Sequence, residues 1–149
     1  MPVKLMIVNG PSLNLLGERE PEIYGRTTLK EVEDTCQNYA SQNGINLEFL
    51  QSNHEGVLVD WIQEARKSAD ALIINPAGTT FHSVPIYDAL KVFGKPIIEL
   101  HISNIHARDD MHRYSKISPA ATGVICGLGT YGYIAAIKAA VHLVTAIQT

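Results

Sequence analysis

The sequence predicts an α/β domain built on a five-stranded parallel sheet, and two observations support this. Five short apolar runs of strand length recur along the chain, at residues 5–8, 47–50, 71–74, 97–100 and 124–126. Segments with the apolar spacing of helices lie between these runs. Because strands that alternate with helices pair in parallel through right-handed crossovers, we expect a doubly wound sheet. The 149 residues show no internal repeat, linker or low-complexity segment, so we expect one domain over residues 1–149.

Four helices are expected between and after the strands. The first has the clearest signals, since residues 28–31 read Thr-Leu-Lys-Glu, which matches a capping box, and Asn43-Gly44 is a typical stop. Apolar positions indicate a second helix around residues 57–65 and a third around residues 84–90, ended by Gly94. The last helix begins near Tyr131 and is apolar over more than one stripe, which indicates contact with another subunit as well as with the sheet. For these elements we expect the flavodoxin-like strand order 2-1-3-4-5.

Composition limits the classes of partner. The chain carries 12 basic and 15 acidic residues, a net charge of −3, and no basic run, so we expect no nucleic-acid partner and no anionic membrane surface. Cys36 and Cys126 lie far apart in apolar settings, which is typical of reduced thiols in a cytoplasmic protein. The sequence shows no secretory signal and no stretch long enough to span a bilayer. We therefore expect a cytoplasmic protein that acts on a small molecule.

Residues 96–104 are the segment with the most evident chemistry. The apolar run is broken by Glu99, and His101 follows two positions later. Ligands of open α/β sheets bind at the carboxyl ends of the strands, so a histidine coupled to a carboxylate there is a candidate acid or base. The alternative is a capped strand end at which His101 only satisfies backbone groups. This segment alone leaves both interpretations open.

Three connections are longer or more polar than the fold requires, at residues 9–26, 75–82 and 101–118. All three leave strands that are neighbours near the switch point of the expected order, so we expect them to converge on one crevice. The first contains no phosphate-binding glycine motif. It does contain Arg19 and Tyr24, and a guanidinium near a phenol stabilises the phenolate, which could then act as a base. Simple packing of the two side chains is the alternative, and these residues alone favour it.

The second and third connections offer further polar groups. Asn75 ends its strand beside the expected crevice, where its amide could bind a carboxylate or carbonyl oxygen, and an anion could sit at the start of the following helix. An ordinary Asn-Pro turn is the alternative. The third connection holds three histidines and two aspartates, but their spacing matches neither a zinc helix motif nor an EF-hand. Arg108 and Arg113 would also oppose a metal ion, so we expect no metal.

Longer motifs run from one end of the chain to the other. They are Asn-Gly-Pro-x-Leu-Asn-Leu-Leu-Gly-x-Arg-Glu-Pro-x-x-Tyr-Gly at 9–25, Gln-Ser-Asn-His-Glu-Gly at 51–56, Asn-Pro at 75–76, Asp-Ala-Leu at 88–90, Glu-Leu-His-Ile-Ser-Asn-Ile-His-Ala-Arg at 99–108 and Gly-Val-Ile-Cys-Gly-Leu-Gly at 123–129. Together they closely resemble the type II 3-dehydroquinate dehydratases.

The resemblance implies a lyase that serves the shikimate pathway of aromatic amino acid biosynthesis or quinate metabolism. The implied reaction is the anti elimination of water from 3-dehydroquinate, through an enolate, to give 3-dehydroshikimate. It implies no metal and no organic cofactor. It also implies a homo-oligomer, a dodecamer built from trimers, in which Asp88 reaches the site of a neighbouring subunit.

The resemblance also implies roles for individual residues. Tyr24 matches the base that takes a proton from the carbon next to the ketone, and Arg19 matches the residue that keeps this base ionised. His101 matches the acid that protonates the departing hydroxyl, and Glu99 would orient its ring. The carboxylate-binding groups of the family are matched by Asn75 and by the backbone of residues Ile102 and Ser103.

Three positions depart from the family pattern. Ser12 stands where the family usually has asparagine, Phe81 where it has a substrate-binding histidine, and His112 where it has arginine. A histidine and an arginine follow one place later, as His82 and Arg113. The family positions at 81 and 112 bind the ring hydroxyls away from the reacting carbons, so we expect altered hydroxyl recognition.

Two classes of function follow from this pattern. The first is a lyase that acts on 3-dehydroquinate or on a close relative altered at the distal ring substituents. The second is a binding or assembly protein that kept the fold and lost the reaction. Retention of Tyr24, Arg19, His101 and Glu99 together favours the enzyme, because a binding protein needs no base and acid.

Overall fold

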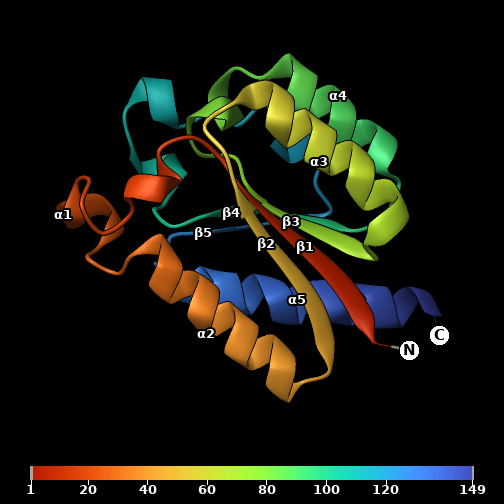
Figure 1. Ribbon diagram of the computed structural model, residues 1–149. Coiled ribbons are helices and arrows are strands. Elements are labelled where there is room, and N and C mark those ends of the chain that lie inside the picture. Colours follow the sequence, from red (N-terminus) through yellow and green to blue (C-terminus); the bar gives the residue numbers. More distant parts are fainter. Residues whose placement is uncertain (1, 149) are drawn as a thin grey trace.

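A computed structural model describes residues 2–148 and contains one five-stranded sheet between two layers of helices (Figure 1). The strand order is β2-β1-β3-β4-β5, and all four strand pairs are parallel. Both the α/β class and the 2-1-3-4-5 order are therefore confirmed. The strands are β1 (Val3–Asn9), β2 (Ile45–Gln51), β3 (Ala71–Asn75), β4 (Ile97–His101) and β5 (Gly123–Cys126).

The three central strands are buried on both faces, as their continuous apolar runs predict. Every residue of β3 and β4 is buried, and so is the stretch from Leu5 to Asn9 in β1. The register sets Asn9 beside Asn75 and Ile74 beside Glu99. The polar residues that end these apolar runs consequently meet at one edge of the sheet, which is its carboxyl edge.

The main helices are α2 (Leu29–Gln42), α3 (Glu55–Ser68), α4 (Val84–Phe93) and α5 (Tyr131–Gln148). The capping box of α2 is confirmed, since the Thr28 hydroxyl accepts from the Glu31 N–H at 3.2 Å and the Glu31 carboxylate accepts from the Thr28 N–H at 3.3 Å. The end of α4 is also confirmed at Gly94, whose φ of 77° is in the left-handed region that favours glycine.

Each face of the sheet has its own core. In Figure 1, α3 and α4 cover the upper face, where Met6, Leu58 and Ile62 are buried. On the lower face α2 and α5 cover Leu5, Ile7, Cys36 and other apolar residues. Leu58 and Ile62 are fully buried, so truncation of either to alanine would cost about 2–5 kcal/mol.

The solvent-exposed apolar surface of α5 is smaller than the sequence suggests. Ala136, Ile137 and Ala140 are fully buried, and Ile134 and Val141 are partly buried against the same core. The helix uses much of its circumference inside the chain because it contacts the sheet and α2 at once. The large hydrophobic residues that α5 exposes are Tyr131 and Ile147 within the described residues.

The two cysteines differ in their surroundings. Cys36 is fully buried in α2, and burial raises the pKa of its thiol to about 12. Cys126 is only half-buried because it lies in β5, which is the edge strand of the sheet. Both are free thiols.

The long connections contain short helical turns that the sequence analysis missed. The one-turn helix α1 (Pro21–Tyr24) lies in the first connection, and 3-10 turns occupy residues 13–15, 77–81, 105–107, 110–112 and 118–120. They hold the connections close to the carboxyl edge of the sheet.

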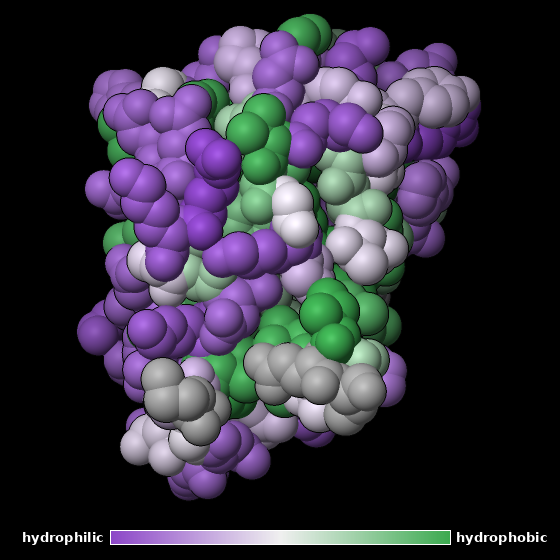
Figure 2. Space-filling view, turned by 90° about the vertical axis from the view of Figure 1, so that its right-hand side faces the viewer, coloured by the Kyte–Doolittle hydropathy of each residue, from purple (hydrophilic) through white to green (hydrophobic). Residues whose placement is uncertain are grey.

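The opposite end of the molecule, where both termini lie, presents a mixture of hydrophilic and hydrophobic residues (Figure 2). Between residues 2 and 148, no helix is both long enough and apolar enough to cross a bilayer.

Candidate active site

A pocket of about 150 Å³ lies at the carboxyl edge of the sheet, where ligands of open α/β sheets bind. All three long connections line it, so the predicted convergence is confirmed. The first contributes Pro11, Ser12, Leu13, Leu16, Arg19 and Tyr24; the second contributes Asn75, Ala77, Gly78 and Phe81; the third contributes His101, Ile102, Ser103, Ile105, Arg108 and His112.

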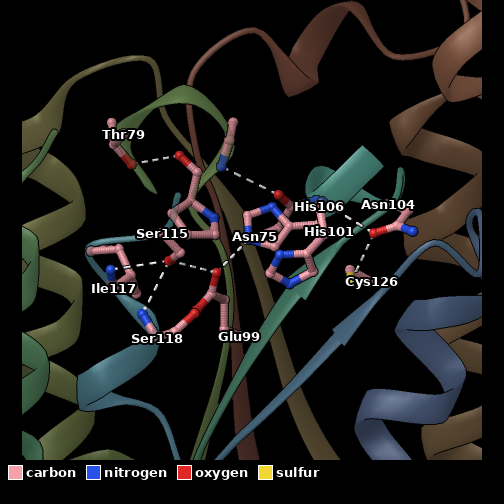
Figure 3. A network of polar contacts seen from close by, with 12 residues as sticks. Asn75, Thr79, Glu99, His101, Asn104, His106, Ser115, Ile117, Ser118 and Cys126 are labelled. Atoms are coloured by element: carbon pink, nitrogen blue, oxygen red, sulfur yellow. Dashed lines mark hydrogen bonds and ion pairs between the residues drawn. The ribbon is translucent and has the colours of Figure 1, made fainter. Parts of the chain in front are cut away.

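His101 ends β4 and is joined to Glu99 from behind. Its Nε2 lies 2.5 Å from Glu99 Oε2, and both side chains are almost completely buried (Figure 3). Ring nitrogen Nδ1 has no hydrogen-bond partner within residues 2–148. Since His101 bonds a carboxylate rather than the backbone, the interpretation as a simple strand cap is wrong. The contact with Glu99 leaves Nδ1 available to a molecule in the pocket.

Glu99 is held as an ion by hydroxyl groups from the third connection. Ser118 Oγ donates to Oε1 at 2.6 Å and Ser115 Oγ donates to Oε2 at 3.0 Å (Figure 3). Burial acts to raise the pKa of Glu99, but the hydrogen bonds from His101, Ser118 and Ser115 and the charge of His101 outweigh it. The pKa of this carboxyl therefore lies below its ordinary value. Glu99 does not line the pocket, and it acts on a bound molecule through His101.

Two guanidinium groups lie close to the ring of Tyr24. Arg19 Cζ is 5.1 Å from the centre of its ring, and Arg108 Cζ is 5.6 Å from it. Both contacts favour an electron-rich ring, and negative charge on the phenol oxygen increases that attraction. The sequence analysis gave Arg108 no role at this tyrosine. Its position at the end of the motif at 99–108 was the available signal, but sequence spacing does not show that the third connection folds over the first.

Asn75 presents its amide to the pocket in a fixed orientation. Its Nδ2 donates to Tyr133 Oη at 3.0 Å, and its Oδ1 accepts from the Ala77 N–H at 3.3 Å. The backbone here is strained, since Ala77 has a φ of 53°. Ile102 and Ser103 line the pocket beside Asn75, as expected for a shared binding surface.

The anion site suggested at the start of the helix after Asn75 stays a prediction. The chain first enters the 3-10 turn at residues 77–81, and α4 begins only at Val84. The Ser83 hydroxyl accepts from the Ile86 N–H at 3.1 Å and so caps the first turn of α4.

Two of the three departures from the family pattern meet on one wall of the pocket. Phe81 and His112 are in edge-to-face contact, and His112 Nδ1 lies 2.8 Å from Asp109 Oδ1. The displaced residues do not replace them, because His82 is exposed and Arg113 binds Asp110 at 3.1 Å, and neither lines the pocket. The third departure, Ser12, also lines the pocket. It adopts a φ of 70°, a conformation that asparagine tolerates better than serine.

Asp88 stands apart from the other predicted site residues. It lies on the exposed side of α4 and is not among the residues that line this chain's pocket. No lysine is among the lining residues either. In the part of the chain that the structure describes, no three His, Cys, Asp or Glu side chains gather in a way that could hold a metal ion.

Comparisons with known proteins agree with this arrangement. The family model described as "Dehydroquinase class II" matches residues 3–141. A 3-dehydroquinate dehydratase from Agrobacterium fabrum is 50% identical over 135 residues, which cover 91% of this chain and 93% of that protein. A catabolic 3-dehydroquinase from Verticillium alfalfae is 51% identical over 144 residues, which cover 96% of each chain.

A solved structure shows the same fold at high similarity. The type II dehydroquinase from Butyrivibrio crossotus superposes with a TM-score of 0.91 at 39% identity, covering 93% of this chain and 97% of the other. The family match spans nearly the whole chain, and the pocket holds the residues through which the sequence resembles that family. This chain belongs to the class II dehydroquinase family.

Proposed function

We propose that this chain is a 3-dehydroquinate dehydratase, a hydro-lyase that converts 3-dehydroquinate to 3-dehydroshikimate. The observation that carries the proposal is that one pocket is lined by a tyrosine close to two guanidinium groups and by a histidine bonded to a buried carboxylate. An elimination of water needs a base for the C–H bond and an acid for the departing hydroxyl, and these two groups supply them. The reaction serves the shikimate pathway or quinate metabolism.

In the first step, the Tyr24 phenolate removes a proton from the carbon next to the ketone. The electron pair of that C–H bond moves into the ring, and the ketone becomes an enolate. Arg19 and Arg108 face the tyrosine ring and place positive charge beside the base before the proton moves. Preorganised charge of this kind lowers the barrier because it needs no rearrangement during the reaction.

In the second step, the enolate collapses and the C–O bond to the departing hydroxyl breaks. His101 donates a proton from Nδ1 to that oxygen, so the leaving group departs as water. Glu99 holds the ring through Nε2 and thereby fixes which nitrogen faces the substrate. The substrate has then lost one hydrogen and one hydroxyl, and Tyr24 and His101 return to their starting states by proton exchange with solvent.

Binding of the substrate carboxylate falls to Asn75 and the backbone N–H groups of Ile102 and Ser103. Asn75 ends β3, Ile102 and Ser103 follow β4, and all three residues line the same pocket. A neutral donor set suits a carboxylate that must be held without quenching the nearby phenolate. The wall formed by Phe81 and His112 faces the remainder of the ring, away from the reacting carbons.

A substrate altered at the distal ring position is a second candidate, and the Phe81–His112 wall favours it. Phe81 offers no hydrogen bond, and His112 is already engaged by Asp109. A ring hydroxyl beside these side chains would lack a strong partner. A closely related substrate without that hydroxyl would bind this wall without an unpaired polar group.

The proposed protein is one domain over residues 1–149, located in the cytoplasm, and its subunits form a dodecamer built from trimers. Asp88 is exposed on α4, so it is free to approach the pocket of a second copy. Two valines on the same helix, Val84 and Val92, are more than half exposed and would be covered by such a contact.

The test of activity is the appearance of the conjugated enone product by ultraviolet absorbance after 3-dehydroquinate is added to the purified protein. A Tyr24→Phe variant prepared in the same way serves as the control for contaminating activity. Turnover by the wild type and its loss in the variant support the proposal. If the folded wild type produces no enone, this chain is not a 3-dehydroquinate dehydratase.

A further inference from the structure

A buried chain of hydrogen bonds runs behind the pocket and ends at Asn75. The Asn9 Nδ2 group donates to the Leu50 carbonyl at 3.0 Å, and the Tyr133 hydroxyl donates to Asn9 Oδ1 at 2.7 Å. The Asn75 Nδ2 group donates to Tyr133 Oη at 3.0 Å, and Asn75 Oδ1 accepts from the Ala77 N–H at 3.3 Å. Asn9, Asn75 and Tyr133 come from β1, β3 and α5 and are almost completely buried.

Each of these four hydrogen bonds has only one possible direction. The Leu50 carbonyl can only accept, so Asn9 must turn its NH₂ group toward it and its oxygen toward Tyr133. The phenol has one hydrogen, which it must donate to Asn9, and it can then only accept from Asn75. Asn75 must therefore direct its NH₂ group toward Tyr133 and its oxygen toward the Ala77 N–H.

We propose that Tyr133 is a positioning residue for substrate binding, because its hydroxyl sets the direction in which the pocket amide of Asn75 points. This inference rests on the proposed function, in which Asn75 binds the substrate carboxylate. Of the two hydrogens on Asn75 Nδ2, one is donated to Tyr133, and no hydrogen bond within residues 2–148 uses the other. The pocket thus receives an N–H donor from Asn75, which is the group that a carboxylate needs.

Tyr133 is suited to this role because it cannot act in another way at this site. The side chain is fully buried and does not line the pocket, so it does not touch a bound substrate. Burial raises the pKa of its phenol far above its ordinary value, so the hydroxyl keeps the hydrogen that Asn9 accepts. Its aromatic ring fills the core beside Phe49, with the ring centres 6.0 Å apart, and a phenylalanine would preserve that packing.

The first experiment is Tyr133→Phe, which removes the hydroxyl and leaves the ring. Without the hydroxyl, the amide of Asn75 loses the partner that fixes its orientation and spends part of its time with the oxygen toward the substrate carboxylate. We expect KM for 3-dehydroquinate to rise about tenfold, the usual effect of one weakened hydrogen bond, while kcat changes little. The matched control is Tyr131→Phe, since Tyr131 lies on the same helix but is exposed, and it should leave both constants unchanged.

A double-variant cycle separates positioning from general destabilisation. If Tyr133 acts through Asn75, Tyr133→Phe should raise KM in the wild-type background and have no further effect in an Asn75→Ala background. A purely structural role would give the same change in both backgrounds. Equal changes in the two backgrounds, or an unchanged KM in Tyr133→Phe, would overturn the inference.

A second variant and a second readout keep the test informative. If Tyr133→Phe gives no folded protein, Asn9→Ala removes the acceptor of the hydroxyl and should produce the same dependence on Asn75. The side-chain NH₂ signals of Asn75 in an NMR spectrum, assigned by their loss in Asn75→Ala, should move in Tyr133→Phe and stay in place in Tyr131→Phe. This readout needs no turnover, so it tests the hydrogen-bond chain even if the proposed activity fails. Asn75 NH₂ signals that stay in place in Tyr133→Phe would contradict the chain of hydrogen bonds itself.

Discussion

Phe81 and His112 meet edge to face in the pocket wall, with their ring centres 5.4 Å apart and their planes at 85°. The contact joins the 3-10 turn at residues 77–81, after β3, to the 3-10 turn at residues 110–112 in the third connection. His112 is held from its other side by Asp109, so this wall is ordered without a ligand but offers few free hydrogen-bonding groups.

The first prediction concerns this wall. The double variant Phe81→His and His112→Arg should raise kcat/KM for 3-dehydroquinate by tenfold or more, because each restored polar partner for a ring hydroxyl is worth roughly 1–3 kcal/mol. Steady-state kinetics of both single variants and the double variant measure the effect. If the double variant gains nothing and the wild type is already as fast as its relatives, the Phe81–His112 wall does not limit hydroxyl recognition.

The second prediction concerns the base. Tyr24→Phe should lower kcat by on the order of a hundredfold to ten-thousandfold while ligand binding stays close to that of the wild type. Arg19→Ala and Arg108→Ala should each lower kcat in the same direction, because both guanidinium groups face the Tyr24 ring. Binding of a substrate analogue by calorimetry provides the control. A Tyr24→Phe variant with a wild-type kcat would remove Tyr24 from the mechanism.

These residues also mark where sequence reasoning succeeds and where it stops. The sheet and its order were predictable because apolar runs, caps and crossovers are local signals, and they bring Glu99, His101 and Asn75 to one edge by topology alone. The contact of Arg108 with Tyr24 was not predictable in this way, since it depends on how the third connection folds over the first.

The hydrogen bonds from Ser115 and Ser118 to Glu99 and from Asn75 to Tyr133 likewise join residues far apart in the chain. Serines and a core tyrosine carry no sequence signal that separates such a role from ordinary packing. The 3-10 turn at residues 77–81 and the Ser83 cap of α4 were also invisible in the apolar pattern.

The third prediction is that no imine forms between protein and substrate. No lysine lines the pocket, so the ketone has no amine within reach. Treatment with borohydride in the presence of 3-dehydroquinate should leave the intact mass of the protein unchanged. A stable adduct on any lysine would contradict the enolate mechanism.

The fourth prediction concerns assembly. Light scattering at micromolar concentration should give the mass of a homo-oligomer, and Asp88→Ala should lower activity without changing the fold of the single chain. The physical reason is that Asp88 and the exposed Val84 and Val92 share the solvent side of α4, away from this chain's own pocket. A monomeric mass in a fully active preparation would exclude a contribution of Asp88 to a neighbouring site.

The last prediction follows from the ionisation of Glu99. Its pKa in the folded protein lies below the ordinary value of 4.5, because hydrogen bonds from His101, Ser118 and Ser115 outweigh the effect of burial. A carboxyl whose pKa is lowered by folding contributes stability that is fully present above its unfolded pKa and is lost as pH falls through its folded pKa.

The comparison that isolates this contribution is between the wild type and Glu99→Gln. Glutamine occupies nearly the same volume and can accept some of the same hydrogen bonds, but it does not titrate. At about pH 7 the variant should be less stable by roughly 1–3 kcal/mol, since a buried charge-assisted network is replaced by weaker bonds.

Below about pH 4.5 the difference should shrink, because Glu99 has a lower pKa in the folded protein and unfolding of the wild type therefore takes up a proton, which acid favours, whereas the variant has no such proton to bind. All other carboxyls are common to the two proteins, so their effects cancel in the difference. Urea unfolding at matched protein concentration, from about pH 7 down to about pH 3, measures the difference in unfolding free energy between the two proteins. A stability difference that stays constant over this range would mean that folding does not lower the Glu99 pKa. A wild type that gains stability relative to the variant as pH falls would mean that the carboxyl is protonated in the folded protein, and either result would exclude Glu99 as a charged partner that orients His101.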